Sequence, residues 1–534
     1  MAASRVAPDP EMSAHRAQTA FENFPISRRE LTDFALIFVI SAAFYLWVAD
    51  RGDILGNLSD GAAYLILADM FSPWANTPAW GLWPLKVFLF PPLYPVSLGL
   101  LGGGSETLST AYALTALMQA MAAGAVYLWL CSLSIERIAA MLLTAGFALS
   151  AGSLSSVLII QSEALFIALV FVSLTFACSR SRGLMIAAVC GGLCVLARTA
   201  GIALIVAGLL WGLRGRLRSP SVVAAFLLPG LVWFVFGRVF GRSATYTNAL
   251  PDLAQLLPRN LEILGANLTV FPDALGALFD LYNAADTAIF AMLLVVLAMP
   301  VWCLRIRHNQ LDAWFLAIYL LMIVLWPYPE HQSRFVFVVL PVLLGYSYLF
   351  VGQLSTKFGM HRRVLPMSLV AAIPLLVSSG STLNFVNLLS NADEPELRAF
   401  VRSPLWHQID DKHEATKTLK LLSRVAEAQV EIDSLLPADA CVVTTIPHRL
   451  PYYARRIARR VMSSDAPDTV FWERFRGCPY VFMVAARLDQ KASLPPMYPY
   501  ERIKQHMEVL NVELWYEEKR GGPVLAMLAK VAPP

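Results

Sequence analysis

Long apolar runs recur through residues 31–385 and constrain the fold of this chain more than any other feature. They lie near residues 34–49, 108–131, 138–152, 161–178, 184–197, 199–213, 222–237, 287–304, 312–326, 335–352 and 364–383. The chain is 57% hydrophobic and 15% charged, whereas soluble proteins carry about 25% charged residues. The pattern predicts a mainly α polytopic membrane protein, a helical bundle of about 11 transmembrane helices, although several runs are short against the ~20 residues of a full crossing.

Two segments leave alternatives open. Residues 184–213 form either one long helix or two short helices broken at Arg198. The short run 87–101 is interrupted by Pro91, Pro92 and Pro95, and it reads as re-entrant or interfacial rather than as a full crossing.

Basic residues decide the orientation of the bundle. If Arg28 and Arg29 are cytoplasmic and the runs alternate, the short outer loops hold only Arg51, Lys86, Arg198 and Arg334. The cytoplasmic loops then hold Arg137, Arg180, Arg182, Arg214, Arg216, Arg218, Arg305, Arg307, Lys357, Arg362 and Arg363. This asymmetry is the positive-inside pattern of an inner (cytoplasmic) membrane protein. It predicts that the first outer loop (residues 50–107), residues 238–286 and the C-terminal region face the periplasm or another extracytoplasmic space.

The two ends of the chain differ from the bundle. Residues 1–30 are polar and predict a cytoplasmic tail rather than a cleavable signal peptide. Residues 386–534 are mixed polar and contain short apolar runs between helical segments, which predicts a small extracytoplasmic α/β soluble domain. Arg455, Arg456, Arg459 and Arg460 form a basic cluster there. It is either a solvated face or a surface for anionic head groups or glycan. The net charge of +4 is too small to imply nucleic acid.

The exported domain contains two cysteines, Cys441 and Cys478, whereas the other five lie in or beside the apolar runs. An oxidising compartment permits a disulfide between them. Spacing alone says nothing about geometry, so the bridge stays open at this point.

Asp60 stands just outside the first apolar run and opens the segment SDGAAYLILADMF. Tyr64 and Ala68 follow at four-residue spacing, so that all three share one face of a helix. The rest of the loop contains several tryptophans and prolines, a composition typical of the membrane interface. A carboxylate held there is well placed to act on a substrate that is itself half lipid.

Further charged groups stand at the same predicted membrane face: Glu163, Arg198, Glu330, His331 and Arg334. Each has a simpler interpretation. Glu163 would favour a helix N-terminus, the two arginines would extend toward the interface, and His331 would be a polar loop residue. Together they combine carboxylates with guanidiniums, which suits a lipid phosphate and a hydroxyl acceptor.

Four motifs in order resemble the GT-C superfamily of integral membrane glycosyltransferases, which includes the aminoarabinose transferase of lipid A and the protein mannosyltransferases. They are Asp60 with Tyr64 and Ala68, residues 91–95 (PPLYP), residues 162–166 (SEALF) and residues 198–201 (RTAG). The resemblance covers roughly residues 31–385. It implies a GT-C-like fold and a sugar donor carried on a polyprenyl phosphate.

The resemblance also implies a role for Asp60 as the catalytic base. Many members follow this aspartate with glutamate, whereas here Gly61 follows. The second carboxylate must then come from elsewhere, with Glu163 first and Asp53 or Asp69 next. Lys86 becomes a candidate contact for a phosphate.

The expected reaction moves a sugar from the polyprenyl-phosphate donor to a hydroxyl of a lipid, polysaccharide or protein acceptor, with inversion. The expected substrate-binding residues are Tyr64, Lys86, Arg198, Glu330, His331 and Arg334. No His/Cys/Asp cluster has metal-ligand spacing, so no cofactor is expected, although a divalent cation at the phosphate stays open. Membrane lipids are the remaining expected partners. Two alternatives stand beside this one: a transporter or flippase of lipid-linked sugars, and a non-catalytic scaffold for envelope assembly.

Overall fold

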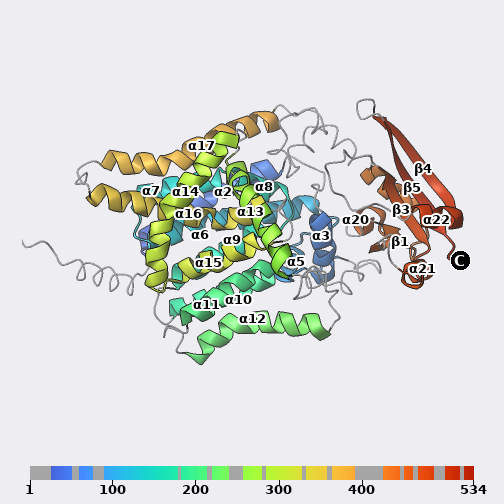
Figure 1. The fold of residues 1–534 in the computed structure, drawn as a ribbon, viewed down its shortest axis with the longest axis horizontal. Helices are drawn as coiled ribbons and strands as arrows, with labels where there is room; N and C mark the ends of the chain where they lie inside the picture. The colour runs from blue at the N-terminus through green and yellow to red at the C-terminus, as the bar shows by residue number, and fades with distance from the viewer. Residues whose placement is uncertain are drawn as a thin grey trace, which may run out of the picture. The chain divides into compact units, whose positions relative to one another are not determined.

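The computed structural model describes residues 26–50, 59–75, 90–177, 182–212, 219–239, 256–279, 284–326, 332–357, 364–390, 425–444, 450–460, 467–485, 500–517 and 522–534. Within them the chain is mainly helical, with one five-stranded sheet near the C-terminus (Figure 1). It divides into two compact units. The helical unit comprises Met1–Arg51, Leu89–Tyr94 and Tyr112–Ala392, and the loop–sheet unit comprises Gly52–Phe88, Pro95–Ala111 and Asp393–Pro534.

All eleven apolar runs of the sequence are helical in the structure, as predicted. The helical unit is built from α2 (Arg28–Ala49), α6 (Leu108–Ser132), α7 (Arg137–Ala148), α8 (Ala151–Leu158), α9 (Glu163–Phe176), α10 (Arg182–Ala197), η2 (Thr199–Gly201), α11 (Ile202–Trp211), α12 (Pro220–Val239), α13 (Leu256–Ala277), α14 (Ala284–Arg307), α15 (Leu311–Val324), α16 (Gln332–Lys357) and α17 (Val364–Ser390). The first four residues of α6 belong to the other unit. Helix α10 packs against both α9 and α12, and α11 packs against α15.

Several of these helices are long enough to cross a bilayer. Among the described residues, five helices meet the length and hydropathy of a span, or six if the bent pair α7 and α8 is one span. Five shorter apolar helices accompany them, among them α9, α11 and α15. The chain is therefore a multi-pass membrane protein, and the figure of about 11 crossings stays a prediction.

Segment 184–213 is two helices, which settles the first alternative left open by the sequence. Helix α10 ends at Ala197, Arg198 is extended with φ −154° and ψ 138°, and η2 leads into α11. The chain turns back onto α10 here, because a Cβ on Gly201 would lie 2.3 Å from the carbonyl carbon of Cys194. Only glycine tolerates so close a backbone approach. This turn fixes the backbone position from which the Arg198 side chain extends.

One helix of the unit is not predicted by the sequence. Helix α13 lies within residues 238–286, the segment assigned to an outer loop. Its Asn267 is fully buried and donates hydrogen bonds from Nδ2 to the carbonyls of Val324 (2.7 Å) and Trp326 (2.8 Å). These carbonyls lie at the C-terminal end of α15, where helices leave acceptors unsatisfied. Asn267 therefore fixes the end of α15.

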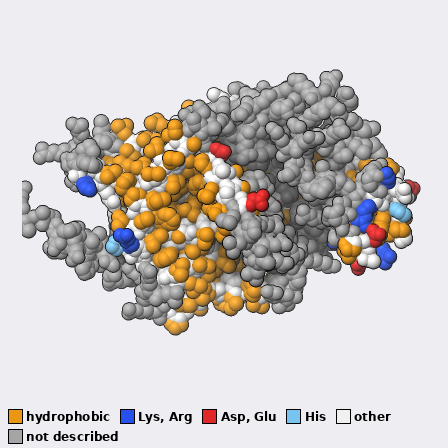
Figure 2. Space-filling view, in the orientation of Figure 1, with side chains coloured by type: hydrophobic (Ala, Val, Ile, Leu, Met, Phe, Trp, Pro, Cys, Tyr) orange, Lys and Arg blue, Asp and Glu red, His pale blue; other side chains and the backbone are white. Residues whose placement is uncertain are grey.

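The surface of the helical unit is apolar where lipid would contact it. Figure 2 shows hydrophobic side chains gathered over the helices of this unit. Exposed large side chains include Leu228, Leu231, Val232, Phe234 and Val235 on α12 and Ile289, Met292, Leu293 and Val296 on α14. Contiguous exposed apolar surface of this kind indicates a membrane contact rather than a soluble surface.

The loop–sheet unit joins part of the first outer loop to the C-terminal region. Its helices are α3 (Ser59–Phe71), α20 (Leu450–Ala454), α21 (Asp468–Arg476), α22 (Tyr500–Ile503) and η6 (Lys504–His506), with most of α5 (Leu93–Leu100). Residues 425–435 are also helical. Helix α20 packs against α3. Gly99 of α5 sits so close to α3 that a Cβ would lie 2.3 Å from the carbonyl oxygen of Ala68. The helix predicted from Asp60 onward is therefore a packed element.

The sheet confirms the predicted small α/β domain. Its strands are β1 (Cys441–Thr444), β2 (Ile457–Arg460), β3 (Tyr480–Ala485), β4 (Met507–Glu517) and β5 (Gly522–Val531), in the order β2-β1-β3-β5-β4. Strand β1 is parallel to β2 and β3, whereas β5 is antiparallel to β3 and β4. Cys441 and Cys478 are disulfide bonded, with their Cα atoms 4.7 Å apart. The bridge joins the start of β1 to the residues just before β3.

The basic cluster of the C-terminal domain is not one surface. Arg456 is 5% exposed, and its guanidinium pairs with the carboxylate of Asp433 and donates to the backbone carbonyl of the same residue (2.7 Å). It therefore fixes the end of helix 425–435 and is not part of a solvated face. Arg459 and Arg460 lie in β2, a strand that the sequence did not predict.

Candidate active site

Two arginines from distant parts of the helical unit converge on one carboxylate oxygen. Arg334 donates from Nε to Oε1 of Glu163 (2.7 Å), and its Nη2 lies 2.6 Å from the same oxygen. Arg198 forms an ion pair with that oxygen through Nη1. The side chain of Glu163 is 3% exposed, and those of Arg198 and Arg334 are 12% and 22% exposed. We refer to these three residues as the Arg–Glu–Arg cluster.

Each member of the cluster comes from a helix end or a helix break. Glu163 is the first residue of α9, Arg198 stands in the extended break before η2, and Arg334 lies in the first turn of α16. Groups at helix ends are positioned by several elements at once, because the chain changes direction there. The structure thus joins the three residues that the sequence assigned to one membrane face.

The contacts also decide between the two interpretations of these charges. Glu163 does not act simply as a helix-end carboxylate, because its Oε1 accepts both guanidiniums. Arg198 does not extend to solvent, since its guanidinium carbon lies 5.0 Å above the centre of the Phe335 ring. That ring in turn contacts Trp326, with 5.0 Å between the ring centres. Aromatic and ionic contacts together hold the Arg198 head in place.

The cluster carries a net positive charge in an apolar setting. Two guanidiniums face one carboxylate, and arginine stays protonated in proteins. A buried charge is costly unless it is paired. Arginine pairs geometrically with phosphate or carboxylate oxygens, so two guanidiniums held side by side are suited to bind an anion.

Several buried polar atoms without a hydrogen-bond partner belong to Glu163 itself and to residues in or just before the helices that carry the cluster or pack against them. Among the described residues they include Nε2 of Gln161, Oε2 of Glu163, the hydroxyl of Tyr319, and both Oε1 and Nε2 of Gln332. Tyr319 packs on Phe166, which lies one turn after Glu163 in α9, with 6.3 Å between ring centres. The sequence analysis missed the two glutamines and Tyr319. The only hint in the sequence is position: Gln161 stands two residues before Glu163, and Gln332 stands two residues before Arg334.

Asp60 and Tyr64 belong to the loop–sheet unit. Asp60 lies in the first turn of α3 and is half-buried, and Tyr64 is 5% exposed one turn later. The structure confirms the helix on which the two residues were expected to share a face.

Asp69, a reserve candidate for the second carboxylate, lies in α3 and binds the loop before α6. Its Oδ1 accepts a hydrogen bond from the backbone N–H of Ser105 (2.9 Å), and its Oδ2 accepts one from the Ser105 hydroxyl. Burial raises the pKa of the Asp69 carboxyl, while the two hydrogen bonds from Ser105 act in the opposite direction. These contacts fix the loop before α6, which is a structural task.

Four further candidates, Asp53, Lys86, Glu330 and His331, lie outside the residues that the structure describes. Their roles stay predictions. In the described part of the chain, no group of three or more His, Cys, Asp or Glu residues is arranged to hold a metal ion.

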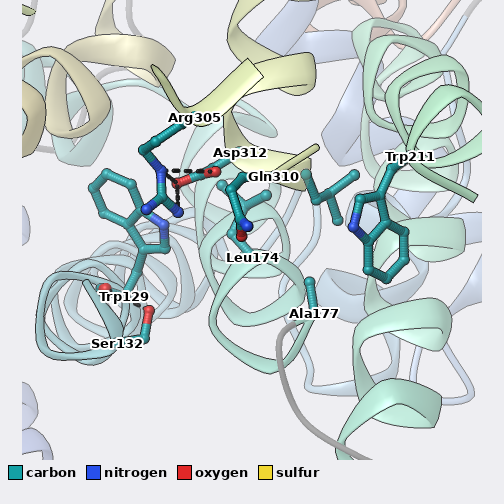
Figure 3. Close-up of a pocket in the computed structure, with 9 residues that line it drawn as sticks. Trp129, Ser132, Leu174, Ala177, Trp211, Arg305, Gln310 and Asp312 are labelled. Atoms are coloured by element: carbon teal, nitrogen blue, oxygen red, sulfur yellow. Dashed lines mark hydrogen bonds and ion pairs between the residues drawn. The ribbon is translucent and has the colours of Figure 1, made fainter. Parts of the chain in front are cut away.

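A pocket lies at the other end of the same helices. It is lined by Trp129, Ser132, Leu174, Ala177, Trp211, Arg305, Gln310, Leu311 and Asp312 (Figure 3). Leu174 and Ala177 stand at the C-terminal end of α9, about 20 Å from Glu163 at a rise of ~1.5 Å per residue. Arg305 and Asp312 form an ion pair across it, with Nη2 and Oδ2 2.7 Å apart. The cavity volume of about 10 Å³ leaves room for roughly one water molecule, which is too little for a substrate.

The chain was compared with known proteins. No family model matches it, and no curated protein matches it. Among solved structures, it is similar to ArnT from Cupriavidus metallidurans bound to undecaprenyl phosphate, with 15% identity, a TM-score of 0.47, and coverage of 94% of this chain and 98% of that chain. It is also similar to ArnT from Cupriavidus metallidurans in the apo state, with 14% identity, a TM-score of 0.48, and coverage of 93% and 98%.

Proposed function

We propose that the protein is a membrane glycosyltransferase that moves a sugar from a polyprenyl-phosphate donor to a hydroxyl acceptor. One observation carries the proposal: two guanidiniums converge on a single buried carboxylate oxygen at the ends of apolar helices. An anion held there by an apolar bundle suits a phosphate whose other substituent is a lipid chain. The motif resemblance in the sequence supports the same reaction.

Arg198 and Arg334 bind the donor phosphate in this proposal. As the bond between the anomeric carbon and the phosphate oxygen breaks, its electron pair passes to that oxygen. The two guanidiniums stabilise the negative charge that grows there, which is electrostatic catalysis at the site of developing charge. A phosphate is already a good leaving group, so no acid is required to protonate it.

Asp60 acts as the base in this proposal. It takes the proton of the acceptor hydroxyl while the hydroxyl oxygen attacks the anomeric carbon from the face opposite the phosphate. The new glycosidic bond forms as the old one breaks, and the configuration inverts. The base assignment rests on the family resemblance and on the predicted interfacial position of Asp60.

Glu163 acts as a positioning residue rather than as a second base. Its Oε1 holds both guanidiniums, and a carboxylate with two cationic partners is a poor proton acceptor. It keeps the arginines oriented before the donor arrives. Preorganised donors of this kind cost no reorganisation during the reaction.

The C-terminal domain faces the extracytoplasmic side in this proposal, and the membrane is the inner one. Two independent observations support that orientation. The basic loops follow the positive-inside pattern, and Cys441 and Cys478 are disulfide bonded. Structural disulfides persist in oxidising compartments and are rare in the cytosol.

Replacing either arginine by glutamine is expected to weaken binding of undecaprenyl phosphate by about 10- to 150-fold, the effect of losing one charged hydrogen bond. Each single variant should fold, because Glu163 keeps the other guanidinium as a partner. Equilibrium binding to purified protein in nanodiscs measures the loss. Arg307→Gln, at the last residue of α14, is the matched control and should bind like the wild type.

Unchanged lipid-phosphate affinity in both Arg198→Gln and Arg334→Gln would refute the anion site. Lys86, in the first outer loop, would then be the next basic residue to test.

The orientation is tested by counting reactive thiols. The chain has seven cysteines, and protein isolated from membranes, then unfolded without reductant, should take up two fewer alkylating mass labels than reduced protein. The double variant Cys441→Ser with Cys478→Ser should label equally with and without reductant. Full labelling of the unreduced wild type would contradict the bridge and remove its support for the orientation.

A further inference from the structure

Neutral polar groups accompany the charges at the Arg–Glu–Arg cluster. The side chains of Gln161 and Gln332 are buried, 3% and 1% exposed, yet Nε2 of the first and both polar atoms of the second have no hydrogen-bond partner. The hydroxyl of Tyr319 is likewise buried and unpaired. Native proteins seldom leave buried polar atoms without a hydrogen-bond partner, so each of these atoms is expected to bind a water molecule or a ligand.

Helix geometry brings Gln332 close to the arginines. Residues three and four apart on a helix share a face, so Gln332 stands one turn before Phe335 on the same side of α16. The Phe335 ring lies 5.0 Å from the guanidinium carbon of Arg198. Gln161 stands two residues before Glu163, just ahead of Ser162, the N-cap residue of α9.

The chemistry of these groups differs from that of the arginines. An amide both donates and accepts hydrogen bonds, as does a phenol hydroxyl. A phosphate dianion offers only acceptors, and a prenyl chain offers neither donors nor acceptors. A sugar ring carries hydroxyls that donate and accept at once, so it matches the amides best.

We propose that Gln161 and Gln332, with Tyr319, form the subsite that recognises the sugar of the lipid-linked donor, beside the arginines that hold its phosphate. The inference rests on the proposed function and deepens it. The two glutamines are specificity-determining residues: they act on the difference in affinity between sugar-bearing and bare lipid phosphate.

The test uses Gln161→Met and Gln332→Met, which keep volume and remove the polar atoms. The probes are undecaprenyl phosphate and three derivatives that carry a hexose, an N-acetylhexosamine or an aminopentose. The wild type should bind at least one derivative about tenfold tighter than the bare lipid, the factor that one or two hydrogen bonds supply. Each variant should bring that ratio close to one and leave the affinity for the bare lipid unchanged.

A second readout separates recognition from a structural role. Both amide atoms of Gln332 lack a hydrogen-bond partner. Replacing such an amide by an apolar side chain of the same size should not destabilise the ligand-free protein, so the melting temperature of Gln332→Met should equal or exceed that of the wild type. Gln429→Met is the matched control, because Gln429 is a buried amide with an unpaired Oε1 in the loop–sheet unit. It should leave the ratio unchanged.

The outcomes are distinct. A ratio preserved in both variants, or a wild type that prefers none of the three derivatives, overturns the sugar subsite while the phosphate site stands. Variants that melt lower and keep the ratio assign the glutamines to structure and also overturn it. A wild type that does not bind bare undecaprenyl phosphate removes the proposed function together with the inference.

Discussion

Asp60→Asn is expected to lower the rate of sugar transfer by about 10²–10⁴-fold, the usual effect of losing a positioned general base. Asparagine keeps the shape of the side chain and cannot accept the proton. The variant should insert into the membrane, melt like the wild type and bind undecaprenyl phosphate with unchanged affinity, because the arginines that hold the phosphate are intact. Single-turnover transfer from a radiolabelled donor measures the rate without interference from product release.

Glu106→Gln is the matched control for the base. Glu106 is another carboxylate of the predicted first outer loop; its side chain is 81% exposed, and its Oε1 lies 3.9 Å from Nη2 of Arg455. An exposed pair of this kind contributes little, so the transfer rate should stay unchanged. Near-normal turnover in a folded Asp60→Asn protein would remove the base assignment, and the scaffold alternative would gain support.

Glu163→Gln is expected to destabilise the protein by about 3–5 kcal/mol, the typical result of removing one partner from a buried ion pair. The variant leaves the guanidiniums of Arg198 and Arg334 close together without their shared carboxylate. Undecaprenyl phosphate supplies the missing negative charge. It should therefore raise the melting temperature of Glu163→Gln more than that of the wild type, because a ligand that binds only the folded state stabilises it.

Asp312→Asn is the control that distinguishes stabilisation by a phosphate at the Arg–Glu–Arg cluster from a general stabilising effect of lipid. Asp312 is also buried and pairs with Arg305 at the opposite end of the helices (Figure 3). Its loss should destabilise the protein as well, but the lipid phosphate should raise the melting temperature no more than it does in the wild type. Equal rescue of the two variants would argue against a phosphate at Glu163.

The helices were predictable because hydrophobicity is a local property. Every apolar run became a helix, and the break at Arg198 was recognised as one of two alternatives. Helix α13 was missed because it is less apolar than the runs and is held by a tertiary contact, the hydrogen bonds from Asn267 to the end of α15. A local sequence pattern cannot reveal a contact between residues 57 positions apart.

The three charged residues of the Arg–Glu–Arg cluster were predictable from the sequence, whereas their arrangement was not. The sequence grouped Glu163, Arg198 and Arg334 by their shared membrane face, since charges are rare in apolar segments. It did not foresee that Glu163 binds both arginines, a pairing from which we propose a positioning role for a residue that was expected to be the second catalytic carboxylate. The partners stand 35 and 171 residues away along the chain, and only the fold brings them together.

In the C-terminal domain, too, the general class was predictable from the sequence, whereas individual elements and contacts were not. Its class followed from alternating apolar runs, but the strand β2 was hidden by Arg459 and Arg460. Arg456 looked like its basic neighbours and is buried against Asp433. Composition identifies a basic stretch, whereas burial decides which arginine supports the fold and which one faces solvent.

The central claim is that Arg198 and Arg334 hold a lipid phosphate. The most direct measurement is an experimental structure of the protein with undecaprenyl phosphate in a lipid nanodisc. The account predicts phosphate oxygens within about 2.7–2.9 Å of guanidinium nitrogens from both arginines, the usual length of a charged hydrogen bond, with Glu163 still paired to them. A phosphate bound elsewhere, with the Arg–Glu–Arg cluster closed and unliganded, would contradict it.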